Sequence, residues 1–326
     1  MIVTQPGPLT AVPAGGSPPK RKTGRLAAAR RRVDWMPYWL ILPATVSLVV
    51  VLGYPIVRLV ELSFQSYGLT QLFDHTTVWD GVTNYRVILS SGSFWSSVLR
   101  TFVFTASCVG LTMVLGMAFA HLFIRLGKRM RTLLSSGMIL VWAMPPITAV
   151  LVWQWLFANQ FGVVDWMLTK VGLTSFANTD WFAQSPFSAF AIITLMIVWQ
   201  AVPFVALSLY AGLVQIPGEL YEAARVDGAG GWRTYRTITL PLLKPIVLLL
   251  LILSVIWDFN VFTQIWALTG GGPNGGTQTV GVWSYVEAFV GQSYGLGAAA
   301  SVVTVFIVAA ISFYYVKHLV STSEVR

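Results

Sequence analysis

Six long apolar segments, almost free of charged residues, constrain the fold of this 326-residue chain more than any other feature. They cover residues 39–56, 97–124, 132–157, 187–213, 246–268 and 296–316. A helix needs about 20 mostly apolar residues to cross about 30 Å of hydrocarbon, and each segment is near or above that length. Only 10% of the residues are charged, whereas soluble domains typically contain about 25%. The sequence therefore predicts an all-α integral membrane protein with six transmembrane helices.

The placement of Lys and Arg predicts how these helices are oriented. Of the 21 basic residues, 17 fall in four places: the N-terminal arm, the connection after the second segment, residues 215–245 and the C-terminal tail. By the positive-inside rule, both termini and residues 215–245 should be cytoplasmic. The net charge of +9 does not indicate a nucleic-acid partner, because the basic residues flank the apolar segments and no basic groove with interleaved aromatics accompanies them.

Residues 1–35 are predicted to form a cytoplasmic basic arm that precedes a membrane domain of residues 36–326. The first 24 residues are rich in Pro, Gly and Ser and lack the apolar content to pack, so we expect them to be disordered. Residues 24–35 alternate Arg clusters with Leu26, Val33 and Trp35, a pattern compatible with an amphipathic helix on the inner membrane surface. No small-residue cleavage site follows at the distance a removable signal peptide requires.

Residues 215–245 form a charged island between the fourth and fifth apolar segments. Pro217 suits the first turn of a helix, and Glu222 favours the positive end of its dipole. Gly228 should end this helix in a left-handed conformation, and a second short segment should follow around residues 232–238. A short helix with an Ala face and an acidic residue predicts a surface that docks into a groove of a partner protein.

Two motifs resemble a known family. The run Glu222-Ala-Ala-Arg-Val-Asp-Gly-Ala-Gly230, continued to Leu-Pro241-Leu-Leu-Lys-Pro245, closely resembles the cytoplasmic "EAA" loop of permease subunits in binding-protein-dependent ABC importers. Leu268-Thr-Gly-Gly-Gly-Pro273 resembles the sugar branch of that family, typified by maltose, trehalose and glycerol-3-phosphate permeases. The resemblance implies a type I importer permease fold with a coupling helix between helices 4 and 5. It assigns ATPase coupling to Glu222, Ala223, Ala224 and Gly228, with Asp227, Leu240 and Pro241 in support.

The same resemblance implies the partners and the mechanism. The partners would be a second homologous permease, two copies of an ATP-binding subunit, and an extracytoplasmic solute-binding protein or lipoprotein, at a bacterial or archaeal plasma membrane. ATP would close the ATPase pair, move the coupling helices and switch a central cavity between inward and outward access. Gly127-Lys128-Arg129 lacks the second glycine and the hydroxyl of a phosphate loop, so ATP and magnesium should bind to the partner ATPase. We expect this chain to carry no cofactor and to be no enzyme.

Polar residues inside the apolar segments indicate a solute path, because an unpaired polar group in hydrocarbon costs several kcal/mol. Asp258 is the one carboxylate well inside a segment, and amides lie beside indole rings elsewhere. Amides and carboxylates bind hydroxyls, and aromatic faces cover the apolar side of a pyranose ring, so the mixture suits a carbohydrate. The alternative is polar contact between helices. The candidates are Asp258, Asn260, Gln264, Gln200, Trp199 and Gln154.

These observations favour a sugar importer whose substrate is a di- or oligosaccharide such as trehalose or a maltodextrin. Glycerol-3-phosphate or a polyol is the alternative, although phosphate recognition usually recruits Arg or Lys and the segment interiors offer none. A secondary transporter would need an ion relay and often two similar halves. A membrane scaffold that does not transport a solute is a further alternative, because such a protein could use the same docking helix.

The remaining signals are weaker. The outward connections 61–95, 158–186 and 269–295 are candidate contacts for an external partner, or plain connecting loops, and the last should hold a short helix at 282–290. The lone Cys108 excludes an intrachain disulfide, and three widely separated histidines predict no metal site.

Overall fold

Long apolar helices dominate the part of the chain that the structure, a computed structural model, describes, namely residues 36–323. The predicted basic arm of residues 1–35, including the amphipathic segment 24–35, lies outside the described residues. Two compact units divide the chain at Leu52 and Gly53. The first contains α1 (Met36–Leu48) and most of a π-helical turn, η1 (Val49–Gly53).

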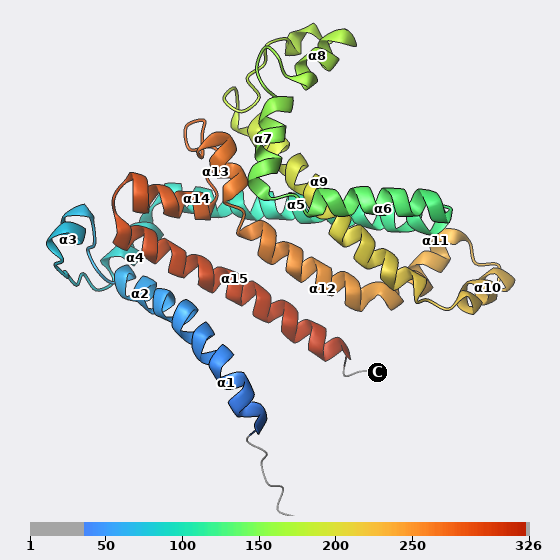
Figure 1. The fold of residues 1–326 in the computed structure, drawn as a ribbon, viewed down its shortest axis with the longest axis horizontal. Helices are drawn as coiled ribbons and strands as arrows, with labels where there is room; N and C mark the ends of the chain where they lie inside the picture. Colours follow the sequence, from blue (N-terminus) through green and yellow to red (C-terminus); the bar gives the residue numbers. More distant parts are fainter. Residues whose placement is uncertain (1–35, 324–326) are drawn as a thin grey trace, which may run out of the picture. The chain divides into compact units, whose positions relative to one another are not determined.

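The second unit carries the other long helices, α2 (Tyr54–Ser63), α5 (Gly92–Arg125), α9 (Pro186–Val214), α12 (Leu240–Phe259) and α15 (Tyr294–Ser323). Within residues 36–323, five helices are long and apolar enough to cross a membrane, with α1, η1 and α2 counted as one. They correspond to five of the six predicted segments. Figure 1 shows α12 and α15 side by side, with α9 crossing close to α5.

The third predicted segment, 132–157, is not one straight helix. It folds as α6 (Lys128–Trp142) and α7 (Pro146–Leu156), which are bent by 100° at the break between them. The cause is the pair Pro145-Pro146, because proline lacks an N–H and disfavours helical backbone at the preceding residue. The expected number of six spans is reached when this bent pair is counted as one.

Small residues let the central helices approach closely. A Cβ added at Gly116 of α5 would lie 2.6 Å from Cγ1 of Val205 on α9, so only glycine fits at that crossing. Ala120, Leu209 and Leu243 are buried around it and join α5, α9 and α12 in one apolar cluster. This packing holds α9 and α12, which both line the candidate cavity described below, against α5.

Shorter elements connect the long helices (Figure 1). The list in chain order is α3 (Leu69–Asp74), α4 (Thr83–Ser90), α8 (Val163–Lys170), η2 (Thr174–Phe176), α10 (Gly218–Val226), α11 (Gly231–Thr234), η3 (Tyr235–Thr239), α13 (Thr263–Thr269), α14 (Val280–Tyr285) and η4 (Val286–Val290). The helix predicted at 282–290 is present as α14 and η4. The two short segments predicted in the charged island are also present, as α10 and as α11 with η3.

Candidate functional site

The charged island folds into a helix with a defined start and a defined end. Pro217 is the N-cap and α10 begins at Gly218, one residue later than a proline in the first turn would place it. At the other end Gly228 N–H donates to Arg225 O at 3.1 Å, and Ala229 N–H donates to Ala224 O at 2.9 Å. These two bonds form a Schellman motif, which satisfies carbonyls that a helix end leaves free.

Gly228 adopts the left-handed backbone expected of it, with φ +71°. A Cβ added there would meet no atom within 4 Å. The position therefore favours glycine through backbone energy alone and not through crowding.

A hydrogen bond ties α10 to the start of the next long helix. The hydroxyls of Tyr221 and Thr239 lie 3.1 Å apart, and Thr239 is buried at the end of η3, directly before α12. Sequence reasoning missed both residues, because a hydroxyl pair 18 positions apart in a loop has no spacing signature. The contact therefore links α10 to the residue directly before α12.

The Ala face expected on α10 is divided by the fold. Ala224 is buried against its own chain, whereas Ala223 and Glu222 are exposed. Of the two alanines, only Ala223 is exposed, so half of the expected Ala face is covered by this chain itself.

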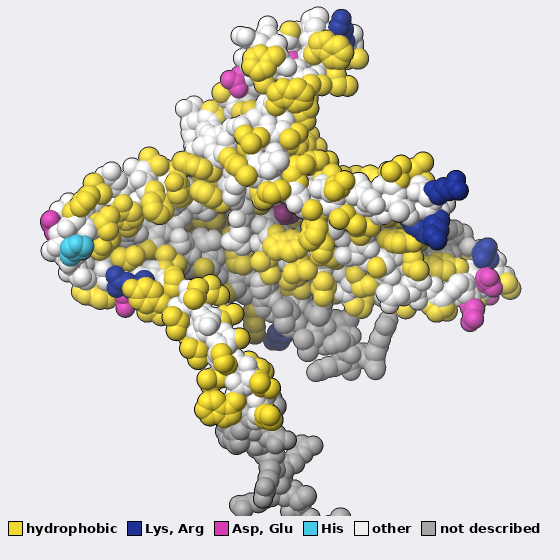
Figure 2. Space-filling model, in the orientation of Figure 1, with side chains coloured by type: hydrophobic (Ala, Val, Ile, Leu, Met, Phe, Trp, Pro, Cys, Tyr) yellow, Lys and Arg dark blue, Asp and Glu magenta, His cyan; other side chains and the backbone are white. Residues whose placement is uncertain are grey.

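Large apolar side chains extend the exposed surface of this loop. Val226 is 88% exposed and Trp232 is 74% exposed. The Trp232 ring stacks on Tyr235 with centroids 5.7 Å apart. Lys and Arg side chains gather at the same end of the second unit, where α6 begins and α10 lies (Figure 2). Exposed Trp and Arg side chains are enriched at protein interfaces, so this end of the unit is a candidate docking surface.

The other predicted coupling residues flank the loop. Asp227 is the C-cap of α10 and is exposed. Leu240 is the first residue of α12, and Pro241 is the second, directly after the π-helical turn η3.

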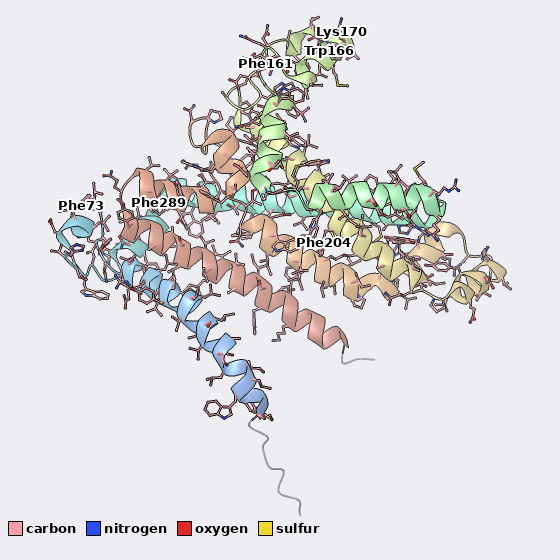
Figure 3. The ribbon with its side chains drawn as sticks, in the orientation of Figure 1. Phe73, Phe161, Trp166, Lys170, Phe204 and Phe289 are labelled. Atoms are coloured by element: carbon pink, nitrogen blue, oxygen red, sulfur yellow. The ribbon has the colours of Figure 1, made fainter. Side chains whose placement is uncertain are left out.

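A second site is a cavity of about 350 Å³ between α6, α9, α12 and α13. Three of the predicted path residues line it together, Asp258, Gln200 and Gln264. Aromatic rings form its other walls, contributed by Trp142, Trp257 and Phe204. Figure 3 shows Phe204 where α9 passes α12. The cavity therefore combines polar groups and aromatic faces as a carbohydrate site requires.

The polar groups in this cavity differ in how they are satisfied. Gln200 Nε2 donates to Met144 O at 2.7 Å, a carbonyl at the break between α6 and α7. Asp258 is buried, and its Oδ2 has no hydrogen-bond partner. A buried carboxylate oxygen without a partner costs free energy, so it requires an explanation such as a ligand hydroxyl.

The remaining predicted path residues lie elsewhere. Asn260 caps α12, donates to Ile256 O at 2.7 Å, and lines a separate cavity of about 460 Å³. Gln154 Nε2 donates to Ala267 O at 3.1 Å and joins α7 to α13. Trp199 packs against Trp153 with ring centroids 6.0 Å apart. The last two contacts fit the alternative of polar and aromatic contact between helices.

Sequence reasoning missed two walls of the Asp258 cavity. Phe204 lies one turn after Gln200, so its position on the same helix face was a usable signal. Trp142 faces the cavity from the end of α6. No pattern in the sequence indicates that contact, because the sharp bend at Pro145 determines it.

Comparison with known proteins identifies the family. Residues 112–322 match the model of the family described as binding-protein-dependent transport system inner membrane component. The chain is 43% identical to the diacetylchitobiose uptake system permease protein DasB of Streptomyces coelicolor, covering 96% of this chain and 97% of that protein. It is 35% identical to the trehalose/maltose transport system permease protein MalF of Thermococcus litoralis, covering 86% and 92%.

A solved structure has the same fold. A crystal structure of a bacterial ABC transporter involved in the import of the acidic polysaccharide alginate matches with a TM-score of 0.75 at 20% identity, covering 88% of this chain and 95% of that chain. This chain therefore belongs to the family of binding-protein-dependent transport system inner membrane components, the non-catalytic multi-pass permease subunits of ABC importers.

Proposed function

We propose that this permease imports a di- or oligosaccharide and is driven by separate ATPase subunits that grip α10. The Asp258 cavity carries the proposal, because a bare carboxylate oxygen, two amides and three aromatic rings suit sugar hydroxyls and pyranose faces. ATP and magnesium bind to the ATPase pair and not to this chain. A second permease completes the central cavity.

The path from the ATPase to the sugar follows the contacts of the loop. Glu222 and Ala223 of α10 enter the ATPase groove, and Gly228 permits the turn that presents them. Closure of the ATPase pair displaces α10, and the Tyr221 to Thr239 hydrogen bond transmits the displacement to η3. Because η3 continues directly into α12, the motion reaches Asp258 near the other end of that helix.

The names of the two relatives described above support a disaccharide or a related oligosaccharide as substrate. Their names specify diacetylchitobiose in one case and trehalose and maltose in the other. Trehalose and maltodextrins, expected from the sequence, stay in the proposal, and diacetylchitobiose joins them. An extracytoplasmic binding protein would select among these sugars and deliver them at the outward connections.

The proposal also includes the orientation, with both termini and α10 in the cytoplasm of a bacterial or archaeal cell. Basic residues at the α10 end of the second unit support it through the positive-inside rule. Reporter fusions at residue 326 and within α8 test it. A reporter protein that is active only in the cytoplasm should be active when fused at residue 326. A reporter that is active only outside the cytoplasm should be active when inserted within α8.

The decisive experiment reconstitutes the permease pair with its ATPase and binding protein in proteoliposomes. Thermal shift of the binding protein first ranks trehalose, maltotriose, diacetylchitobiose and glycerol-3-phosphate. Uptake of the best ligand should require ATP and should fail when α10 is mutated. Uptake without ATP would refute the importer mechanism. Selection of glycerol-3-phosphate alone would refute the proposal that the substrate is a di- or oligosaccharide.

A further inference from the structure

Arg100 lies near the start of the long apolar helix α5, and no carboxylate within residues 36–323 pairs with it. Arg100 of α5 donates from Nε to Gln278 O at 3.0 Å and from Nη2 to Ser97 Oγ at 3.0 Å. Within residues 36–323 the structure contains an ion pair between Arg58 and Glu61, and none that involves Arg100. Since a guanidinium carries five N–H donors, three donors of Arg100 remain for another group.

Arg100 lies at one end of an apolar groove between α5 and α9. The groove has a volume of about 600 Å³, and its walls include Leu99, Val103 and Leu111 of α5 together with Phe187 and Leu195 of α9. The two helices run in the same direction, since Phe104 and Phe190 are in ring contact at 5.4 Å and both Gly116 and Val205 lie farther along. The groove therefore extends from Arg100 and Phe187 toward Leu111 and Leu195.

The position of the groove along α5 matches one leaflet of a bilayer. The helix has 34 residues, which is about 51 Å at 1.5 Å per residue. If the helix is centred on a hydrocarbon core of about 30 Å, roughly 10 Å projects at each end. Arg100 lies about 12 Å from the helix start, at the hydrocarbon edge, and Leu111 lies about 28 Å from it, near the midplane.

The groove is also open to its surroundings in this chain. Leu99 is 65% exposed, Val103 is 59% exposed and Phe187 is 84% exposed. Ser107 and Thr194 are the only other groove residues with polar side chains. These walls do not suit a sugar, which needs several hydrogen-bond partners, but they suit an acyl chain.

We propose that the α5–α9 groove binds a phospholipid with an anionic headgroup. The acyl chain fills the groove from Val103 to Leu111, and the phosphate accepts hydrogen bonds from the free N–H groups of Arg100. An Arg–phosphate pair is charge-assisted and bidentate, so it fixes the headgroup at the level of the Gln278 carbonyl. The lipid would thereby stabilise the junction between α5 and the residues that lead into α14.

Native mass spectrometry of the full chain, released from detergent with phosphatidylglycerol or phosphatidylcholine, tests this proposal. Wild-type protein should retain phosphatidylglycerol in preference to phosphatidylcholine. Arg100→Gln should bind phosphatidylglycerol about tenfold more weakly, the loss expected for one charge-assisted pair. Lys170→Gln, an equal change of charge on an exposed side chain of α8, is the matched control and should bind like wild type.

Two further variants keep the test decisive if Arg100→Gln folds poorly. Arg100→Lys retains the charge but loses the planar fork, so it should bind with intermediate affinity. Val103→Trp fills the groove and should lower the binding of both lipids while Arg100 stays in place. Unchanged lipid binding by Arg100→Gln or by Val103→Trp would overturn the proposal.

Two other outcomes would also overturn it. If inorganic phosphate binds the wild type as well as phosphatidylglycerol does, the groove has no role in recognition. If the lipid is lost when the companion permease is added, the groove is a subunit interface. Neither outcome affects the importer mechanism, which the uptake assay tests separately.

Discussion

Gly228 offers the sharpest test of the coupling loop, because its structure isolates backbone energy from packing. Its φ is +71°, and an added Cβ would meet nothing within 4 Å. Any loss on substitution must therefore come from the left-handed conformation, which costs a residue with a Cβ about 1–2 kcal/mol. The cost is higher for a β-branched side chain and lower for Asn, which tolerates this region.

The expected consequence is a ranked series of uptake rates. A cost of about 1 kcal/mol corresponds to a fivefold change in population, and about 2 kcal/mol to roughly thirtyfold. If the Schellman turn must form for α10 to dock, ATP-driven uptake should fall about fivefold for Gly228→Ala and up to about thirtyfold for Gly228→Val. Gly228→Asn should retain most of the activity. Membrane insertion and the amount of assembled complex should not change.

Gly230 provides the matched control, two residues along the same loop. Its φ is −67° and an added Cβ would also meet nothing within 4 Å. Gly230→Ala changes the same atoms without backbone strain, so uptake should stay at the wild-type rate. Wild-type uptake by Gly228→Val, or an equal loss in Gly230→Ala, would refute the reasoning.

Three other substitutions test the site and the packing. Asp258→Asn keeps the shape of the side chain in its cavity but removes the carboxylate. The rate of sugar uptake at saturating binding protein should fall about tenfold while ATPase docking is unchanged. An unaltered rate would remove Asp258 from the path. Tyr221→Phe removes the hydroxyl contact with Thr239, a hydrogen bond that contributes about 1 kcal/mol. The amount of sugar taken up per ATP hydrolysed should fall, and an unchanged ratio would contradict the role of this contact. Gly116→Leu forces a side chain into Val205 and should lower the free energy of unfolding by about 1–3 kcal/mol. Thermal unfolding in detergent measures this loss, and an unchanged melting temperature would contradict the close crossing.

The sequence by itself determined the fold class, the number of apolar segments and the local geometry of the charged island. These features depend on interactions that are local in the chain. An uncharged run of about 20 residues satisfies its own backbone as a helix. Pro217 and Gly228 place the ends of α10 through the backbone preferences of single residues.

The tertiary structure alone decided which polar residues share a cavity. Asp258 and Asn260 are two positions apart, so helical spacing already separates their side chains, but only the neighbouring helices decide which cavity each one lines. Gln200 and Asp258 are far apart in sequence but line one cavity, since α9 and α12 pack closely where Gly212 meets Leu243 and Ile246. Such neighbourhoods depend on how helices cross and where they bend. Those angles result from packing between distant segments, which hydrophobic periodicity along one segment does not encode.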